Sequence, residues 1–173
     1  MADFNIFIGI DEKAIVRESE YSNNPAAGEF IDSRFIHVMT YNEDSVVDNH
    51  GDKLSLLSVK RSDNIIWRAM SLSPVDSPYS SILTSLEPED VISYSNYVKR
   101  AVRKIQDKTE AVAIDDKGTI DFKPVPNNYW LSAVQNSPPA TSVSLPYTGR
   151  FTIYNGATPI GYCQWKHILI LTG

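Results

Sequence analysis

The chain has 173 residues, of which 42% are hydrophobic and 21% are charged. This composition is typical of a folded globular protein and argues against a disordered or fibrous one. The 16 basic and 21 acidic residues give a net charge of -5, which weakens non-specific attraction to nucleic acid or to an anionic membrane. The length fits one domain, 1–173, in which folding buries roughly 70% of the surface of the unfolded chain.

The first residues and the single cysteine indicate where the protein resides. Asp3 lies where a signal peptide would carry Lys or Arg, and the apolar run after it is too short for an export signal or a membrane span. We therefore expect a cytoplasmic protein that does not enter the membrane. Cys163 is the only cysteine, so an intrachain disulfide and a multi-cysteine zinc site are excluded.

In chain order, the first strand and helix have clear signals. Apolar residues alternate through 4–10 with the period of a strand, and both faces are apolar enough to be covered. Asp11 then precedes a short apolar stripe at 12–17, which predicts one or two turns of helix with Asp11 as the N-cap. Further strands are expected at 35–41, 54–59, 64–70, 80–86 and 128–134, with turns at 48–52 and 115–118. In 64–70, Trp67 shares a face with Ile65 and Ala69, so we expect it in the core.

The segment 89–107 has a different pattern. Its apolar residues recur at helical spacing, with acid at the start and base toward the end, as the helix dipole favours. The stripe consists of Val91, Tyr94, Val98, Ala101, Val102 and Ile105. Together these patterns predict an all-β (mainly) domain: an antiparallel β-sandwich of about 7–9 strands with one helical insertion near 89–107.

Basic residues of the same segment are the one electrostatic anomaly of an acidic chain. They are Lys99, Arg100, Arg103, Lys104 and Lys108, and they fall at helical spacing. One interpretation is a solvated helix face opposite the apolar stripe. The other is a contact for an anionic partner or for an acidic patch on a neighbouring copy.

Metal and catalytic motifs are weak. Cys163, His167 and His37 are the ingredients of a blue-copper site, but no Met follows His167 and Trp165 lies between the two nearest ligands. A buried Cys and an ordinary His explain them better. We find no Gly-x-Ser-x-Gly elbow, phosphate loop or dinucleotide fingerprint. The sequence thus predicts no metal, no cofactor and no enzyme.

Three blocks of sequence carry a family resemblance. The first ends in Ile10-Asp11, the second contains Trp67-Arg68 and Ser71-Leu72-Ser73, and the third covers 147–171. Together they resemble the bacterial inclusion body proteins of the PixA/AidA type. Departures are Ser62-Asp63-Asn64 in place of a Gly-Asp turn and Lys166-His167 where an Asp-Pro pair is common.

The resemblance implies a β-rich cytoplasmic protein that accumulates as inclusions in host-associated bacteria. It transfers no catalytic residues, and it leaves Trp67 and Arg68 open to packing, an ion pair or recognition. We therefore expect a non-enzymatic protein that associates with itself as a dimer or higher homo-oligomer, in a storage or host-interaction accessory role. The alternatives are a lectin-like module, in which exposed Tyr and Trp bind a glycan, and an RNA- or anion-binding module that uses the basic helix face.

Overall fold

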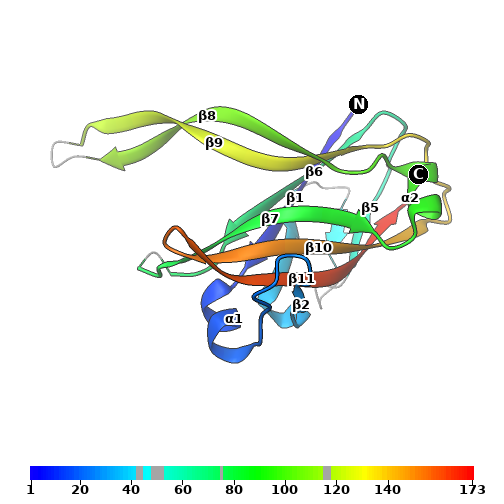
Figure 1. The fold of residues 1–173 in the computed structure, drawn as a ribbon. Helices are drawn as coiled ribbons and strands as arrows, with labels where there is room; N and C mark the ends of the chain where they lie inside the picture. The colour runs from blue at the N-terminus through cyan, green and yellow to red at the C-terminus, as the bar shows by residue number, and fades with distance from the viewer. Residues whose placement is uncertain (42–44, 48–52, 75, 115–117) are drawn as a thin grey trace.

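The core lies between two β-sheets (Figure 1). The computed structural model describes residues 1–41, 45–47, 53–74, 76–114 and 118–173, so the turn predicted at 48–52 and most of that at 115–118 lie outside the described residues. The five-stranded sheet has the order β3-β1-β6-β9-β8, formed by Ile36–Thr40, Asp3–Ile10, Asn64–Ser71, Ile120–Ala133 and Val102–Ile114. The predicted β-sandwich is confirmed.

The second sheet contains the closing strands. It has the order β4-β5-β11-β10-β7, formed by Ser45–Val47, Lys53–Leu56, Thr158–Leu171, Val143–Asn155 and Tyr79–Pro88, and β2 (Glu29–Phe30) also pairs with β11. The helices are α1 (Glu12–Glu18), α2 (Val91–Tyr97) and a 3-10 turn at Ser33–Phe35. α2 lies near the C-terminus in Figure 1, and α1 contacts β7 and the 3-10 turn.

The sheets are mixed, which corrects the prediction of a purely antiparallel sandwich. β1 runs parallel to β6, with Ile6 opposite Trp67, and β11 runs parallel to β5 and to β2. Period-2 alternation fixes which face of a strand is buried. It does not say which strand lies alongside or in which direction, so the parallel neighbours could not be read from the sequence.

Alternating side chains fill the core as expected. Ile6, Ile8 and Ile10 of β1 are fully buried, Trp67 is 1% exposed and Cys163 is 1% exposed. β10 and β11 approach so closely that a Cβ on Gly149 would lie 2.1 Å from the ring of Trp165. The small residue in β10 is therefore what allows the large ring opposite it on β11.

The predicted helix at 89–107 is wrong beyond its first two turns. Asp90 caps α2 by accepting from the backbone N–H groups of Ile92 and Ser93, and Val98 already has extended backbone. From Val102 the chain is β8, paired with β9 over its whole length. Of the predicted stripe, Tyr94, Val98 and Ala101 are buried, whereas Val91, Val102 and Ile105 are exposed.

Candidate functional site

A fully buried carboxylate, which directly follows the first block of the family resemblance, forms hydrogen bonds to serines of the second block. Glu12, in the first turn of α1, is 0% exposed. It accepts hydrogen bonds from the hydroxyls of Ser71 at 2.7 Å, Ser73 at 2.8 Å and Ser81 at 2.6 Å. A buried charge requires such partners. These three hydrogen bonds fix α1 against β6, β7 and the loop between them.

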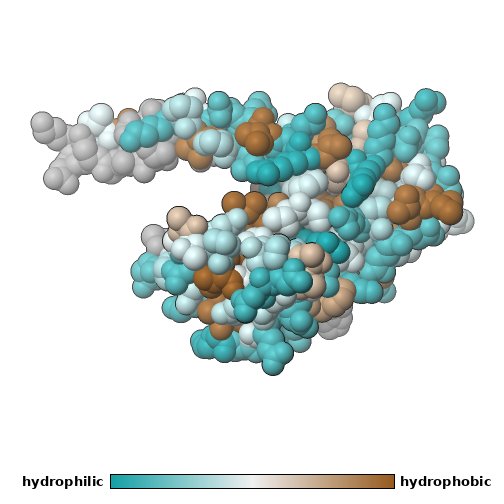
Figure 2. Space-filling model, viewed as in Figure 1, coloured by the Kyte–Doolittle hydropathy of each residue, from teal (hydrophilic) through white to brown (hydrophobic). Residues whose placement is uncertain are grey.

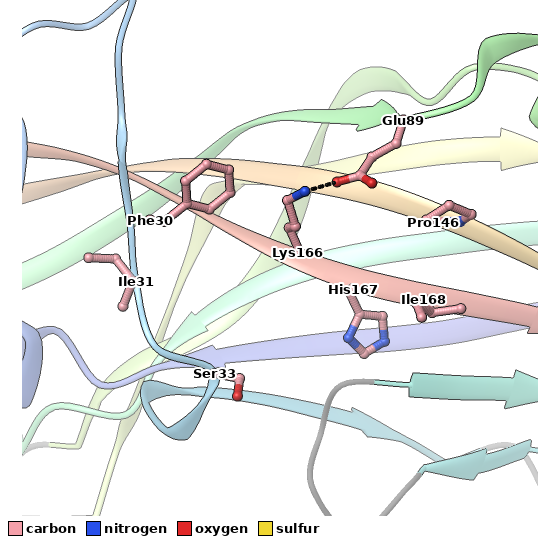
Figure 3. A pocket seen from close by; sticks show the side chains of 8 residues that line it. All are labelled: Phe30, Ile31, Ser33, Glu89, Pro146, Lys166, His167 and Ile168. Carbon is pink, nitrogen blue, oxygen red and sulfur yellow. Dashed lines mark ion pairs between the residues drawn. The ribbon is translucent and has the colours of Figure 1, made fainter.

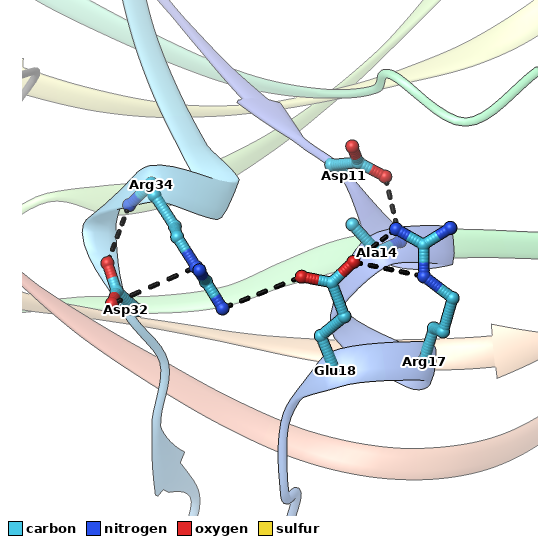
Figure 4. A network of polar contacts seen from close by, with 6 residues as sticks. All are labelled: Asp11, Ala14, Arg17, Glu18, Asp32 and Arg34. Atoms are coloured by element: carbon cyan, nitrogen blue, oxygen red, sulfur yellow. Dashed lines mark hydrogen bonds and ion pairs between the residues drawn. The ribbon is translucent and has the colours of Figure 1, made fainter.

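The remaining polar contacts of α1 are at the surface (Figure 4). Asp11 caps the helix as predicted, since its carboxylate accepts the Ala14 N–H at 2.9 Å. At the other end, Glu18 lies between Arg17 and Arg34, whose guanidinium is 3.5 Å away. The hydrogen bond from Arg17, with the charges of both arginines, lowers the pKa of Glu18. Exposed pairs of this kind orient side chains and add little stability.

A cavity of about 410 Å³ opens beside β11 (Figure 3). β2 pairs with β11 at 163–164 and β5 pairs with it at 168–171, so the cavity lies along the stretch of β11 between them. Its lining is mainly apolar and consists of Phe30, Ile31, Ser33, Glu89, Pro146, Lys166, His167 and Ile168. Lys166 and Glu89 pair at 3.0 Å, so the two charges of the lining neutralise each other.

Behind this cavity the predicted family residues form a buried aromatic row. Trp67 contacts Tyr147 edge-on at 5.0 Å between ring centroids, and Tyr147 contacts His167 at 5.3 Å. Burial raises the pKa of Tyr147 well above its ordinary value. In place of the ion pair considered from the sequence, Arg68 donates to the Asn5 side chain at 2.7 Å and lies 5.4 Å from the ring of Tyr129. These contacts favour packing as the role of both Trp67 and Arg68.

The five basic residues do not share a helix face. Lys99 and Arg100 lie between α2 and β8, whereas Arg103, Lys104 and Lys108 lie on β8. Because side chains alternate along a strand, Lys104 and Lys108 point to one face and Arg103 to the other. Arg100 is 3.7 Å from Glu87, and Arg103 donates to Asn128 at 3.0 Å. The helical arrangement was wrong, and binding of an anionic partner by these residues stays a prediction.

β8 and β9 form a long hairpin whose outer part extends beyond the other strands of the five-stranded sheet (Figures 1 and 2). β8 is the last strand of its sheet, and the side chains of 102–109 are all exposed. Val102 is 50%, Ile105 64% and Ile120 45% exposed. An edge strand with exposed apolar side chains is a template for pairing with another chain. The sequence pattern missed this edge, because it assigned Val102 and Ile105 to a buried helix stripe.

Backbone hydrogen bonds at the base of the hairpin establish which groups point outward. The backbone of Val134 bonds on the side of β6: its N–H donates to the Asp63 carbonyl at 2.8 Å, and its carbonyl accepts from the Ser62 N–H at 2.9 Å. The carbonyl of the neighbouring residue, Ala133, points to the side of β8, where it accepts from the Lys99 N–H at 2.8 Å. Even-numbered residues of β9 therefore direct their backbone groups away from β8. Each is opposite an odd-numbered residue of β8, and the register is regular from 102 to 111. The N–H and C=O groups of Arg103, Ile105 and Asp107 consequently point to the free edge.

The two edges of this hairpin differ. Pro124 and Pro126 are even-numbered residues of β9, so their nitrogens, which carry no hydrogen, lie on the edge away from β8. Proline on an edge discourages the addition of another strand. The outer edge of β8 has no proline in 102–109. Among the described residues of the hairpin, the β8 edge is therefore the one that is open to strand addition.

A polar hollow of about 220 Å³ lies under the hairpin, where Figure 2 shows a recess between the hairpin and the rest of the protein. Its lining residues are Ala69, Ser81, Ile82, Leu83, Pro126, Asn127, Asn128 and Trp130. The Trp130 indole N–H donates to the Leu83 carbonyl at 3.2 Å, which holds the ring across the gap between the sheets. The remaining amides and the hydroxyl give the hollow hydrogen-bonding capacity.

The considered copper ligands are not brought together as a site. His37 is exposed on β3, whereas Cys163 and His167 are buried on β11. Burial, with the nearby charge of Glu29, raises the pKa of Cys163 to about 12. Within the described ranges, no group of three or more His, Cys, Asp or Glu residues could hold a metal ion. None of the helices described is long and apolar enough to cross a membrane.

Comparisons with known proteins agree with this fold. A family model described as PixA, inclusion body protein, matches residues 2–170. A crystal structure of an inclusion body protein (PixA) from Burkholderia cenocepacia J2315 is similar with a TM-score of 0.75 and 15% sequence identity, covering 99% of this chain and 96% of that one. None of the curated proteins matches the chain. Since the family model spans nearly all of the sequence, this chain belongs to the PixA family of inclusion body proteins.

Proposed function

We propose that this protein is a non-enzymatic inclusion body protein that associates with itself through the open edge of β8. Membership of the inclusion body family supports accumulation as inclusions, here in the cytoplasm. The resemblance noted from the sequence supports a storage or host-interaction accessory role. The observation that carries the proposal is the projecting β8 edge, with exposed side chains and outward-pointing backbone groups.

A second copy of the chain is the partner that fits this edge best. A strand from another copy would satisfy the free N–H and C=O groups and cover Val102 and Ile105, which are half exposed or more. The edge also carries Arg103, Lys104 and Lys108 on a chain of net charge -5. Asp107 lies on the same strand, so the edge of a second copy offers an acidic group to these bases as well as basic groups of its own.

Closing the edge with proline tests the proposal. Ile105→Pro removes an N–H that points away from β9, so the hairpin keeps its internal bonds while the edge loses a donor. Ile105→Val is the matched control, because it keeps the N–H and an apolar β-branched side chain. We expect the mass of the wild type and of Ile105→Val to rise with concentration in light scattering, with inclusions on overexpression. Ile105→Pro should stay monomeric with an unchanged far-UV CD spectrum.

Two results would contradict this proposal. A wild-type protein that stays monomeric from micromolar to millimolar concentration, with no inclusions, would remove self-association altogether. Assembly of Ile105→Pro at wild-type concentrations, with the same mass distribution, would show that the contact does not use the β8 edge.

A glycan-binding module is the second candidate, favoured by the polar hollow under the hairpin. Asn127, Asn128 and Ser81 offer amide and hydroxyl groups beside the Trp130 ring, a combination that suits the polar and apolar faces of a sugar. On a glycan array, we expect any specific signal to disappear in Asn127→Ala and to persist in Asn23→Ala, a change in an exposed loop. A signal that both variants retain equally would place the sugar elsewhere.

A further inference from the structure

We infer that two copies pair antiparallel through β8 around a two-fold axis at Ile105, which joins their five-stranded sheets into one. This inference rests on the proposed self-association and specifies its contact. In such a pair, residue 105 of one copy faces residue 105 of the other, and residue 103 faces residue 107.

Backbone direction permits this pairing. Directly opposite residues of an antiparallel ladder exchange both hydrogen bonds only where the backbone groups of both residues point to the partner. Arg103, Ile105 and Asp107 all point to the free edge, as deduced from the β8–β9 register and the bonds of Val134. The pairs 105–105, 103–107 and 107–103 would therefore all be hydrogen-bonded pairs.

The side chains select this axis over its neighbours. With the axis at Ile105, Arg103 of each copy lies opposite Asp107 of the other, the two isoleucines meet on the axis, and Lys104 faces the neutral Gln106. Every other axis from 103 to 108 creates a like-charge pair. An axis at 103, 104, 107 or 108 places Arg103, Lys104, Asp107 or Lys108 opposite the same residue of the other copy. An axis at 106 places Lys104 opposite Lys108. Like charges directly opposite each other destabilise a sheet, and opposite charges stabilise it.

An axis at residue 109 or beyond meets a different obstacle. The β8–β9 register shifts between Ala111 and Ala113, so the alternation of outward-pointing groups is interrupted there. A ladder centred near this irregularity could not run evenly to both sides. The segment 102–108, with its regular register and exposed side chains, is the part of β8 that can form a symmetric ladder.

Charge reversal and rescue test the axis. Arg103→Glu places two acids opposite each other twice per dimer, and Asp107→Arg does the same with two bases. We expect each single variant to raise the dimer dissociation constant by about tenfold or more. The double variant Arg103→Glu/Asp107→Arg restores opposite charges and should return the constant to near the wild-type value. Lys104→Glu changes the charge by the same amount as Arg103→Glu but faces Gln106, and it should have little effect.

A symmetric disulfide is the second test. Residues of a hydrogen-bonded antiparallel pair have Cα atoms about 5.5 Å apart, which lies within the range for a disulfide. Ile105→Cys should therefore form a covalent dimer under mild oxidation. Lys104→Cys is the control, because its two copies would lie more than about 7 Å apart across the axis. The native Cys163 is buried and should not compete.

The outcomes separate this inference from the proposed function. A dimer that shows neither rescue in the double variant nor cross-linking at 105 would overturn the axis and leave self-association standing. A wild-type chain that never dimerises would overturn both. Rescue together with cross-linking at 105 and not at 104 is the result we expect.

Discussion

Glu12 shows how much of this fold depends on one side chain. Its carboxylate is fully buried and accepts hydrogen bonds from serine hydroxyls of β6, β7 and the loop between them. Hydrogen bonds to a charged group contribute more than neutral ones, and losing the acceptor leaves the donors without a partner. The stability of the α1 end of the sandwich therefore depends on this carboxylate.

Removing this acceptor should be costly. We expect Glu12→Ala to lower the free energy of unfolding by roughly 2 to 4 kcal/mol, because Ser71, Ser73 and Ser81 lose their common acceptor. Glu20→Ala, which removes an exposed carboxylate from the same region, should change it by less than about 0.5 kcal/mol. Urea denaturation of both variants measures the difference. Equal midpoints for the two would mean that the cluster adds no stability.

Local patterns predicted some of these residues and not others. The short apolar stripe at 12–17 predicted Asp11 as the helix cap, and the alternation of its own strand placed Trp67 in the core. The Glu12 cluster had no such signal, because Ser81 is 69 positions away from the carboxylate that it contacts. Contacts of this range depend on how strands pair, which the period of one strand does not contain.

At the scale of elements, the segment 89–107 shows why apolar residues at helical spacing led to a wrong prediction of helix. Tyr94 lies on α2, and Val98 and Ala101 follow it. All three are buried, and they have the spacing of a helix. Val102 and Ile105 extend that spacing by coincidence, although their β-branched side chains favour a strand. Pairing with β9 along the whole of β8 decides the outcome, and tertiary context of this kind overrides the local pattern.

The family resemblance identified the fold better than it identified the surface. The three blocks lie on β1, β6, β10 and β11, which carry much of the core, so they indicate the sandwich correctly. None of the three blocks covers the stretch 89–107, which contributes α2 and the first residues of the projecting hairpin. Sequence reasoning therefore located the hydrophobic centre and missed the element on which the proposed association depends.

At the scale of the whole molecule, burial of Cys163 connects stability to pH. The pKa of this thiol is raised from 9.0 to about 12 in the folded protein, first by burial and then by the charge of Glu29. The unfolded chain ionises first, so the contribution of the thiol is complete below pH 9 and is lost as the pH rises toward 12. The raised pKa values of Tyr94 and Tyr147 add to this loss at higher pH.

The thiol contribution can be isolated between pH 9 and 10 by comparison with a variant that lacks the thiol, because the tyrosine contribution is common to both proteins. We expect the wild-type free energy of unfolding to fall in this range by up to about 1.4 kcal/mol per pH unit from Cys163 alone. Cys163→Ala should be less stable than the wild type below pH 9, because it loses buried packing, but its free energy of unfolding should fall less steeply as the pH rises. Urea titrations at a series of pH values compare the two slopes, and identical slopes would exclude the thiol as the cause.

The prolines of β9 limit the number of copies that can assemble through the β8 edge. A hairpin with two open edges could add copies indefinitely and produce a cross-β ribbon, in which each added chain exposes a new template. Pro124 and Pro126 occupy one edge, so a hairpin that pairs through β8 has no second edge to offer. Growth by this contact ends with a closed particle. An inclusion made from such particles would contain natively folded chains packed side by side, and it would dissolve into folded units instead of persisting as amyloid.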